Sequence, residues 1–457
     1  MKLNYKRTIL VGLAFLSISA FWQMYDSVVP LILANNFQLN ESWTGVIMAA
    51  DNILALFLLP LFGSLSDRVN TPIGRRMPFI LCGTAMAAIL LNILPRLANS
   101  YFGSPSLGVL VAFIVVLGML LISMGTYRSP AVALMPDVTP KPLRSKGNAI
   151  INLMGALGGL ISLAVTAVLY SDSRIEANYT VGYIPGENGI QVAVVNYSTL
   201  FAVVSAIMIV AIAVLFITTK EPKLVAENRA YEAAHPEDNL AQTTAEGTEE
   251  LPKAVKRSLI FLLLSISLWF IGYNGVTTWF STYISRVMGE GIGGASTCLL
   301  VATAGAIISY IPIGNLASKI GRKKTIMGGV ILLASCFFIA FLVTVNATTI
   351  TAPMYILFAA VGLAWAAINV NSLPMVVEMC KGSEVGKFTG YYYTFSMIAQ
   401  VVTPVVAGSL LKSIGYKILF PYAAFFVACS FGTMCFVKHG DNKVDAKKGL
   451  DAFDVDD

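Results

Sequence analysis

Charged residues are scarce in this sequence. Only 12% of its 457 residues are Asp, Glu, Lys or Arg, whereas 56% are apolar, and the mean hydropathy is +0.73. Soluble domains carry about twice this share of charged residues, so the composition excludes a water-soluble globular protein. The sequence therefore predicts an integral membrane protein.

Histidine is almost absent and cysteine is sparse. The two histidines, His235 and His439, lie in polar segments, which excludes a histidine-based metal site and leaves no catalytic base inside an apolar run. The six cysteines show no paired spacing, so we expect no disulfide framework. The nearest approach to a phosphate-binding loop, residues 382–388, has the wrong spacing and no Ser or Thr after Lys387, and reads as the start of a helix. We expect a protein that is not an enzyme and that carries no metal or cofactor.

Long apolar runs fill most of the chain. Most reach 20 residues or more, the length with which an α-helix crosses about 30 Å of hydrocarbon, and they lack the strict alternation of a membrane β-barrel. We therefore expect an all-α membrane protein. The predicted spanning helices are twelve, at approximately residues 8–33, 43–65, 77–95, 106–130, 148–170, 197–218, 258–283, 296–317, 325–345, 353–377, 388–411 and 417–437.

Lysine and arginine gather in every second connection between these runs. Because basic residues in short connections mark the cytoplasmic side, we expect a multi-pass protein of the cell membrane with both termini in the cytoplasm. The net charge of +6 follows from this bias. We interpret it as membrane topology and expect the lipid bilayer, not a nucleic acid, as its partner.

Hydrophobicity drops in the middle of the chain, where Glu, Lys and Ala alternate. This composition is typical of a partly helical or disordered cytoplasmic linker. Six predicted spans lie on each side of it. The predicted division is an N-terminal six-helix bundle, a linker, a C-terminal six-helix bundle and a cytoplasmic tail, at residues 1–218, 219–257, 258–437 and 438–457.

The two halves share sequence patterns at equivalent places. The string LSIS occurs at 16–19 and at 264–267, and the same spacing then leads to Tyr-Asp in the first half and Tyr-Asn in the second. An internal repeat of this kind predicts two pseudo-symmetric bundles that enclose a site near the bilayer midplane. Access to that site would alternate by rocking of one bundle against the other.

A basic turn follows the second span of each half. Residues 63–76 read GSLSDRVNTPIGRR, and residues 314–324 read GNLASKIGRKK. Repeated turns of this form resemble the signature of the major facilitator superfamily, and the layout of twelve spans extends the resemblance over the whole chain. The long first turn, GNAI at 147–150 and SLP at 372–374 are similar to forms found in sucrose transporters and in glycoside-pentoside-hexuronide:cation symporters. The resemblance implies the major facilitator fold and a membrane transporter, which we expect to be a monomer.

The acid of the first turn is the leading candidate for gate control. The resemblance implies that Asp67 helps to latch a cytoplasmic gate, where a carboxylate can face the positive end of a helix from the other bundle. Arg68, Arg75 and Arg76 could satisfy helix-terminal carbonyls and lipid phosphates. With Arg128 they complete the predicted gating set. Alternatively these charges only determine topology, which explains the arginines better than the acid.

Ionisable residues inside a span cost about 2.5 to 3.5 kcal/mol at the bilayer centre and are seldom accidental. Asp26 and Asp51 both lie roughly 10 to 13 Å inside the outer end of their spans at 1.5 Å per residue, so they could share a site and bind and release a coupling proton. Alternatively they could hold Na⁺ or form a structural salt bridge with Arg128. Arg128 lies nearer the cytoplasmic half of span 4, so direct pairing is not expected.

The chain departs from the related carriers at their acidic positions. The cation-binding aspartates of the glycoside symporters correspond to Ala55 and Leu59 here. Residues 106–127 lack the acid that plant sucrose carriers have in the fourth span. The resemblance therefore does not extend to sodium coupling through that site, and we assign proton coupling to Asp26 or Asp51.

Amide, hydroxyl and aromatic side chains recur at helical spacing along spans 1, 5, 10 and 11. Amides exchange hydrogen bonds with sugar hydroxyls, and rings stack on the C–H faces of sugars. Gly155 and Gly159 are expected to serve helix packing instead. The predicted substrate-binding residues are Gln23, Tyr25, Asn52, Asn152, Tyr273, Asn274, Trp365, Asn369, Tyr393 and Gln400.

Together these patterns predict proton-coupled uptake of a sugar, a di- or small oligosaccharide such as sucrose or maltose. The alternatives are a Na⁺-coupled glycoside symporter and an exporter of drugs or metabolites. Exporters usually carry a proline in a glycine motif of span 5, which residues 155–159 lack. A sensor would need a soluble output domain larger than the central linker.

Overall fold

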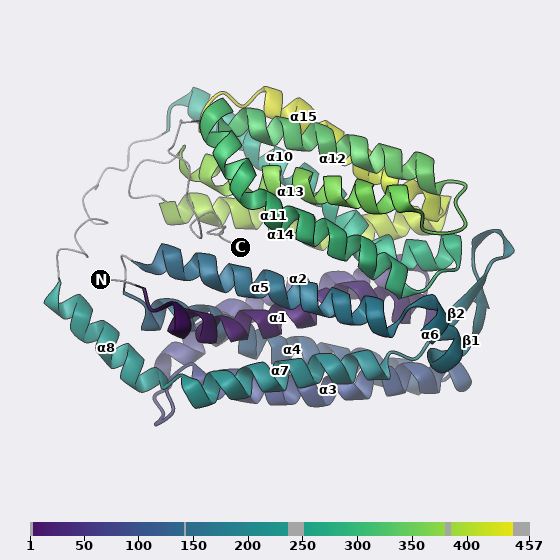
Figure 1. Cartoon of the computed structure of the whole chain (residues 1–457), viewed down its shortest axis with the longest axis horizontal. Helices are drawn as coiled ribbons and strands as arrows, with labels where there is room; N and C mark the ends of the chain where they lie inside the picture. Colours follow the sequence, from purple (N-terminus) through teal and green to yellow (C-terminus); the bar gives the residue numbers. More distant parts are fainter. Residues whose placement is uncertain (1–2, 141–142, 236–250, 380–384, 442–457) are drawn as a thin grey trace. The chain divides into compact units, whose positions relative to one another are not determined.

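The computed structural model describes residues 3–140, 143–235, 251–379 and 385–441, and these residues are predominantly helical (Figure 1). Within them, twelve helices are long and apolar enough to cross a membrane, which agrees with the number predicted. The helix expected near 382–388 is α14, which begins at Val385; residues 382–384 lie outside the described residues.

The chain order of elements starts with six long helices interrupted by a small hairpin and continues with a second set of six. The elements are α1 (Tyr5–Leu31), η1 (Ile32–Asn36), α2 (Glu41–Arg68), α3 (Met77–Gly103), α4 (Leu107–Val138), α5 (Arg144–Leu169), α6 (Asp172–Arg174), η3 (Ile175–Tyr179), β1 (Thr180–Pro185), η4 (Glu187–Gly189), β2 (Gln191–Val195), α7 (Ser198–Thr218), α8 (Glu221–Ala234), α10 (Lys253–Tyr283), η5 (Ile284–Met288), α11 (Ile292–Ile320), α12 (Arg322–Thr344), α13 (Ala352–Val377), α14 (Val385–Ile414), η7 (Tyr416–Ile418) and α15 (Leu419–Cys435).

Several helices extend past the predicted boundaries. The helix α4 continues to Val138, eight residues beyond the predicted end, although Pro130 and Pro136 lie within it. The helix α10 begins at Lys253, five residues earlier than predicted. Hydropathy marks only the length of helix that hydrocarbon covers, whereas the backbone hydrogen bonds of these helices continue into their polar ends.

Contacts between Cα atoms divide the chain into two compact units. Unit 1 comprises residues 1–40, 50–238 and 284–296, and unit 2 comprises residues 41–49, 239–283 and 297–457.

The same helix pairs pack together in both units. In unit 1, α1 packs against α5 and α7, while α3 packs against α4 and α7. In unit 2 the helices at the equivalent positions in the chain form the equivalent pairs: α10 packs against α14 and α15, and α12 packs against α13 and α15. This agreement confirms the internal repeat inferred from the sequence.

Glycine permits the close approach of α1 and α5. A Cβ atom on Gly158 would overlap the backbone carbonyl of Leu16, and one on Gly155 would lie 3.1 Å from the hydroxyl of Ser19. At Gly159 a Cβ would lie 3.7 Å from Oε1 of Gln23, which is ordinary contact. Small residues are therefore needed at the first two positions for helix packing, and Gly158 is the most restricted.

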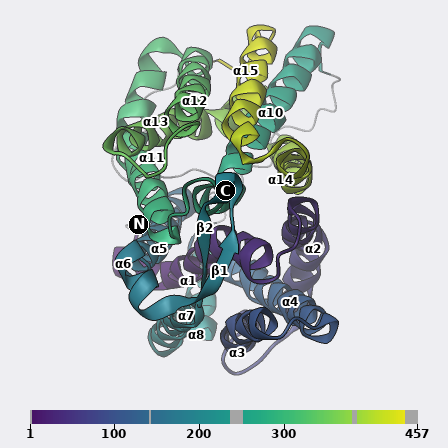
Figure 2. The same ribbon diagram turned by 90° about the vertical axis from the view of Figure 1, so that its right-hand side faces the viewer.

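A short hairpin and the helix α8 lie at opposite ends of unit 1 (Figure 1). The strands β1 and β2 are antiparallel, and their apolar side chains Ile184, Val192 and Val194 pack with Phe102 of α3. The sequence did not predict this hairpin. Figure 2 looks onto that end of the unit, where β2 contacts η1 and η5.

Two arginine hydrogen bonds join the hairpin to neighbouring segments of unit 1. The guanidinium of Arg286 donates to the backbone carbonyls of Ala34, at 2.6 Å, and Pro185, at 3.2 Å. Close by, Asn35 donates to the hydroxyl of Ser285 at 3.1 Å. The turns η1 and η5, which end α1 and α10, are therefore held together by polar contacts.

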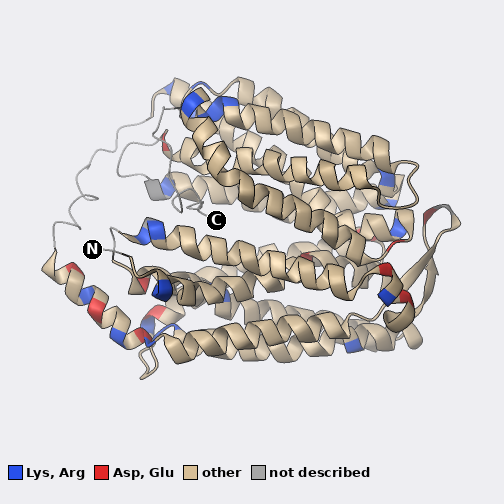
Figure 3. Ribbon diagram, viewed as in Figure 1, with Lys and Arg blue, Asp and Glu red and all other residues tan. Residues whose placement is uncertain are grey.

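Charged residues gather near the ends of the long helices and along α8, whereas the middle stretches of the helices are mostly uncharged (Figure 3). This distribution is the one expected for helices that cross hydrocarbon. The few charges inside the spans consequently define the first candidate site.

Candidate functional site

Two carboxylates and one guanidinium lie together inside unit 1, and we call Asp26, Asp51 and Arg128 the acid cluster. Asp26 interacts electrostatically with both Asp51 and Arg128, and Arg128 also acts on Asp51. Asn52 donates a hydrogen bond to Asp51 at 2.8 Å. The structure thus brings together the two acids that the sequence predicted to share a site.

Arg128 lies in this cluster and not with the other predicted gating residues. Its guanidinium carbon is 5.9 Å from the centre of the Trp22 ring. The predicted end of the fourth span put Arg128 close to the cytoplasm, but α4 continues to Val138. Ten residues of α4 follow Arg128, which places it about 15 Å inside the end of the helix at 1.5 Å per residue, so electrostatic interaction with both acids is possible after all.

The other predicted residues of unit 1 lie on α1, α2 and α5. Gln23 donates to the hydroxyl of Ser27 at 3.4 Å, and its Oε1 lies 3.7 Å from where a Cβ atom on Gly159 would be. The hydroxyl of Tyr25 is buried and finds no hydrogen-bond partner among the described residues. Asn152 is half-buried on α5. Of these side chains, Tyr25 interacts electrostatically with both acids of the acid cluster.

Aromatic rings form the most compact group of predicted residues in unit 2. The rings of Tyr273 on α10 and Trp365 on α13 stack with 3.7 Å between centroids and 6° between planes. Phe270 packs edge-on against the same tryptophan at 5.3 Å. The amide nitrogen of Asn274 is buried without a hydrogen-bond partner among the described residues. A flat apolar surface and a free amide donor therefore lie on adjacent residues of α10.

Three further predicted residues of unit 2 are more dispersed. Asn369 is half-buried on α13, one turn after Trp365. Tyr393 and Gln400 are half-buried on α14, and the Tyr393 ring meets that of Tyr392 edge-on at 5.5 Å. They stay predicted ligand contacts.

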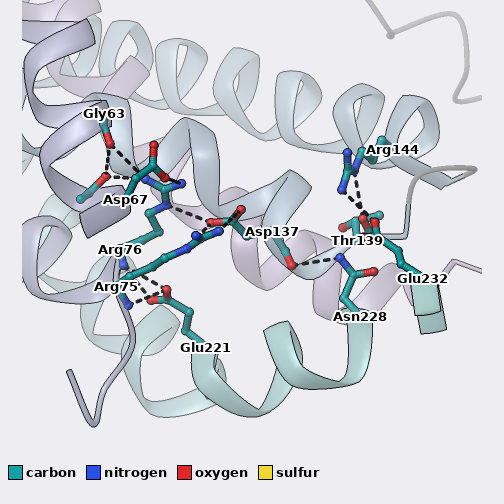
Figure 4. A network of polar contacts seen from close by, with 11 residues as sticks. Gly63, Asp67, Arg75, Arg76, Asp137, Thr139, Arg144, Glu221, Asn228 and Glu232 are labelled. Carbon is teal, nitrogen blue, oxygen red and sulfur yellow. Dashed lines mark hydrogen bonds and ion pairs between the residues drawn. The ribbon is translucent and has the colours of Figure 1, made fainter. Parts of the chain in front are cut away.

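The first basic turn is the centre of an ion-pair network in unit 1 (Figure 4). The Arg76 guanidinium is 5% exposed, and it bonds to Asp67, to Asp137 at 2.9 Å and to the carbonyl of Gly63 at 3.3 Å. Arg75 pairs with the same Asp137 at 2.6 Å. The arginines thus join the C-terminal ends of α2 and α4 to the N-terminal end of α3, and Arg76 does more than orient the chain in a membrane.

Asp67 and Arg68 occupy the exposed edge of this network. The Asp67 side chain is 55% exposed even though it pairs with Arg76, and Arg68 is exposed at the last residue of α2. By contrast, Asp137 is only 15% exposed. Asp137, which the sequence analysis missed, is therefore more buried than Asp67, and it pairs with both Arg75 and Arg76.

Glu221 caps α3 from the start of α8. Its carboxylate accepts hydrogen bonds from the backbone N–H groups of Arg75 (2.8 Å), Arg76 (3.0 Å) and Met77 (2.9 Å). These are donors that a helix N-terminus leaves unsatisfied, and the carboxylate also complements the helix dipole. Gly74 turns the chain here with φ of +118°, and a Cβ atom there would collide with Glu221.

The rest of α8 docks on the C-terminal end of α4 and on the N-terminal ends of α1 and α5. Asn228 donates to the backbone carbonyl of Asp137 at 3.1 Å. Glu232 pairs with Arg144 of α5 at 3.1 Å, and Glu227 pairs with Arg7 of α1 at 3.2 Å. The segment that the sequence assigned to a linker therefore contributes a helix that packs within unit 1.

The second basic turn has an equivalent cap in unit 2. Gly321 has φ of +96°, and Asp441 accepts a hydrogen bond from the backbone N–H of Lys323 at 3.1 Å. Arg322 pairs with Glu378 just after the end of α13. Ser318 stands where the first turn has its acid, and Glu378 and Asp441 supply carboxylates to the second turn from other parts of unit 2.

A known family of membrane proteins matches most of the chain. The family model described as "Major Facilitator Superfamily" covers residues 11–309 and 292–450. The chain belongs to the major facilitator superfamily. It is accordingly a membrane transporter and not an enzyme.

Proteins named as sugar carriers are among the curated relatives of this chain. The sucrose transport protein SUT2 of Oryza sativa subsp. indica is 27% identical over 209 residues, which cover 43% of this chain and 40% of that protein. The general alpha-glucoside permease of Schizosaccharomyces pombe is 42% identical over 53 residues, or 12% of this chain and 10% of the permease. The chain thus matches less than half of the length of these curated relatives.

Solved structures of transporters share the fold. A mutant of the nucleoside transporter NupG is 13% identical with a TM-score of 0.64, covering 94% of this chain and 100% of that one. A bacterial homologue of the iron transporter ferroportin is 11% identical with a TM-score of 0.65, covering 95% and 99%. Identities this low show a shared fold alone.

Asp137, Glu221 and Glu378 are the main residues of this superfamily member that sequence reasoning missed. Asp137 is one residue before the last residue of α4, Glu221 is the first residue of α8, and Glu378 directly follows α13. All three lie outside the predicted spans. A signal existed, since Glu221 directly precedes Pro222 after an apolar run, a sequence typical of a helix start. Its partner 144 residues earlier could not be inferred from that signal.

Proposed function

We propose that this transporter takes up a sugar, a di- or small oligosaccharide such as sucrose or maltose, together with a proton and by alternating access. One observation carries the coupling: Asp26 and Asp51 interact electrostatically with each other and with Arg128 inside unit 1. In apolar surroundings, two neighbouring carboxylates and a cation make proton binding and release at either acid sensitive to the charge of the others.

The relatives named as sucrose transport protein and alpha-glucoside permease support a sugar substrate. The chemistry of the predicted binding residues supports it too. The stacked rings of Tyr273 and Trp365 present an apolar face suited to sugar C–H groups, and the Asn274 amide is a buried donor. A polyhydroxylated neutral ligand needs both kinds of group.

The ion-pair network of the first basic turn is the proposed cytoplasmic gate element. Asp67, Arg75 and Arg76 connect the inner ends of three helices through Asp137, so a change in these contacts would accompany any movement of those ends. We further propose that the protein acts as a monomer in the cell membrane, with both termini in the cytoplasm.

Uptake into proteoliposomes tests the proposal. Radiolabelled sucrose and maltose are offered to the purified protein with and without an imposed pH gradient. We expect accumulation that requires the gradient, and at least tenfold less accumulation in Asp26→Asn or Asp51→Asn. The same type of substitution at the exposed Glu176 of η3 (Glu176→Gln) serves as the control and should leave accumulation unchanged.

Two results would contradict the proposal in different ways. Gradient-independent uptake that survives both aspartate substitutions would remove the proton coupling while keeping the sugar. No uptake of either glycoside, with efflux of cationic dyes, would instead indicate an exporter. Stimulation by a sodium gradient in place of the pH gradient would reassign the coupling ion.

A further inference from the structure

Two neighbouring aromatic residues of α1 carry buried hydrogen-bond donors without an acceptor among the described residues. The indole nitrogen of Trp22 and the hydroxyl of Tyr25 are both buried, and neither finds a partner among the described residues. Buried indole and phenol groups usually hydrogen-bond, and an unmade bond costs about 1 to 3 kcal/mol. Two such costs next to each other point to a ligand that supplies the acceptors.

The two donors lie on one side of the helix. Trp22 and Tyr25 are three residues apart, which puts them on neighbouring positions of a helix surface. Their rings meet edge to face, with 5.3 Å between centroids, and Phe21 packs edge-on against Trp22 at 5.0 Å. The neighbouring rings hold both donors in a defined orientation.

The same tryptophan also contacts the acid cluster. The Arg128 guanidinium lies 5.9 Å from the centre of the Trp22 ring, a distance at which a cation is attracted to the aromatic face. Arg128 in turn acts on Asp26 and Asp51. One side chain therefore offers its ring to the arginine and its N–H to whatever binds beside it.

The chemistry of this place restricts the ligand. An indole N–H only donates, so the ligand must provide an acceptor. A cation offers none, and an anion would be repelled by the two nearby carboxylates. Hydroxyl oxygens of a neutral ligand satisfy both conditions. The ionisable groups that interact here are Tyr25 and Asp26 from α1, Asp51 from α2 and Arg128 from α4.

We propose that the indole N–H of Trp22 and the hydroxyl of Tyr25 bind hydroxyl oxygens of the substrate, and that Trp22 thereby links the bound sugar to the position of Arg128 beside the carboxylates. Trp22 is thus both a substrate-binding residue and a positioning residue for the acid cluster. This inference rests on the proposed sugar transport and names the residue through which sugar and proton sites communicate.

Conservative substitutions separate the two roles. Trp22→Phe keeps an aromatic face for Arg128 and removes the N–H, while Tyr25→Phe removes only the hydroxyl. Initial rates of sucrose and maltose uptake are measured against concentration at one imposed pH gradient. We expect each variant to raise KM three- to tenfold with an unchanged maximal rate. Trp43→Phe is the matched control, because Trp43 is 61% exposed at the start of α2, and it should behave like the wild type.

Removing the ring tests the link to the acids. Trp22→Leu should lose the requirement for the pH gradient, so that sugar equilibrates without accumulating, whereas Trp22→Phe should still accumulate it. A purely structural role would lower the amount of folded protein and leave KM and the gradient requirement of the surviving fraction unchanged. Should the leucine variant fail to fold, the KM of the phenylalanine variant still decides the substrate contact.

The outcomes distinguish this inference from the proposed function. A wild-type KM in both Trp22→Phe and Tyr25→Phe overturns the inference while sugar uptake by the wild type still supports the transport activity. Absence of glycoside uptake by the wild type overturns the proposed function, and this inference with it. A raised KM in the phenylalanine variants together with normal accumulation in Trp22→Leu overturns the link to the acid cluster alone.

Discussion

Glu221 illustrates how much one side chain contributes to this transporter. A single carboxylate satisfies three consecutive backbone N–H groups of a helix that begins 144 residues earlier in the chain, and only 1% of the residue is exposed. Without it, buried donors at the start of α3 would lose their partners. Three short charge-assisted hydrogen bonds in a buried place are among the stronger polar contacts of a protein.

The substitution Glu221→Ala should therefore destabilise unit 1 by about 2 to 4 kcal/mol, since each buried unsatisfied group costs about 1 to 3 kcal/mol and some recover other partners. Glu227→Ala is the matched control on the same helix. Its ion pair with Arg7 is 36% and 47% exposed, and exposed pairs contribute at most about 1 kcal/mol. Thermal unfolding in detergent measures both. Equal unfolding temperatures for the two variants would contradict the role of Glu221 as the cap of α3.

Single residues also show which contacts could be expected from the sequence. Asp26 and Asp51 stood out as candidates because a carboxylate within an apolar run is conspicuous in any membrane sequence. Asp137 could not, because it lies at the polar end of α4, where acids are common. Its importance comes from Arg75 and Arg76, which approach it through the fold.

Among the elements, the pair of α1 and α5 is the most closely packed in unit 1, and glycine makes this possible. A methyl group at Gly158 would collide with the backbone of Leu16, whereas one at Gly118 of α4 would meet nothing within 4 Å. Both positions are inside apolar helices, so a change from glycine to alanine alters helix propensity equally at both. The difference between the two variants therefore reports the effect on packing.

We expect Gly158→Ala to lower stability by about 1 to 3 kcal/mol through overpacking, and to lower uptake because α1 carries Trp22, Gln23 and Asp26. Gly118→Ala should be neutral or slightly stabilising, by up to about 1 kcal/mol from helix propensity. Folded yield by size-exclusion chromatography and initial uptake rates check both. Wild-type yield and uptake in Gly158→Ala would contradict this prediction, because α1 and α5 would then tolerate a larger separation without loss of stability.

The two caps show the repeat at the level of elements. Gly74 with Glu221 in unit 1 and Gly321 with Asp441 in unit 2 each combine a glycine of positive φ with a carboxylate that follows the last long helix of the unit. The acids differ in type and position, so the sequence repeat is weak where the structural repeat is clear. Backbone donors can be satisfied by any carboxylate that reaches them.

At the scale of the whole molecule, the positions of basic residues predict the orientation of the chain. The test starts from a variant in which all six cysteines have been replaced. Two further variants each add one cysteine, at Glu176 or at Ala226, which are exposed residues of η3 and α8. A membrane-impermeant maleimide should label only the cysteine at position 176 in intact cells, and should label the cysteine of either variant in permeabilised cells. Labelling of position 226 in intact cells would reverse the predicted topology.

The sequence by itself determined the membrane class, the twelve spans and the internal repeat, because hydrophobic length and repeated strings are properties of consecutive residues. It also identified the two intramembrane acids and the basic turns. It predicted the helix ends inaccurately. Hydropathy marks where a helix leaves the hydrocarbon, whereas the helix itself ends at its last backbone hydrogen bond.

Only the tertiary structure decided which groups meet. It paired Arg75 and Arg76 with Asp137, brought Glu221 to the start of α3, placed Arg128 near Asp26 and Asp51, and put the Trp22 ring beside that arginine. These partners lie on different helices, far apart in the chain. Their proximity follows from how the helices pack, and no local pattern of charge or hydrophobicity encodes it.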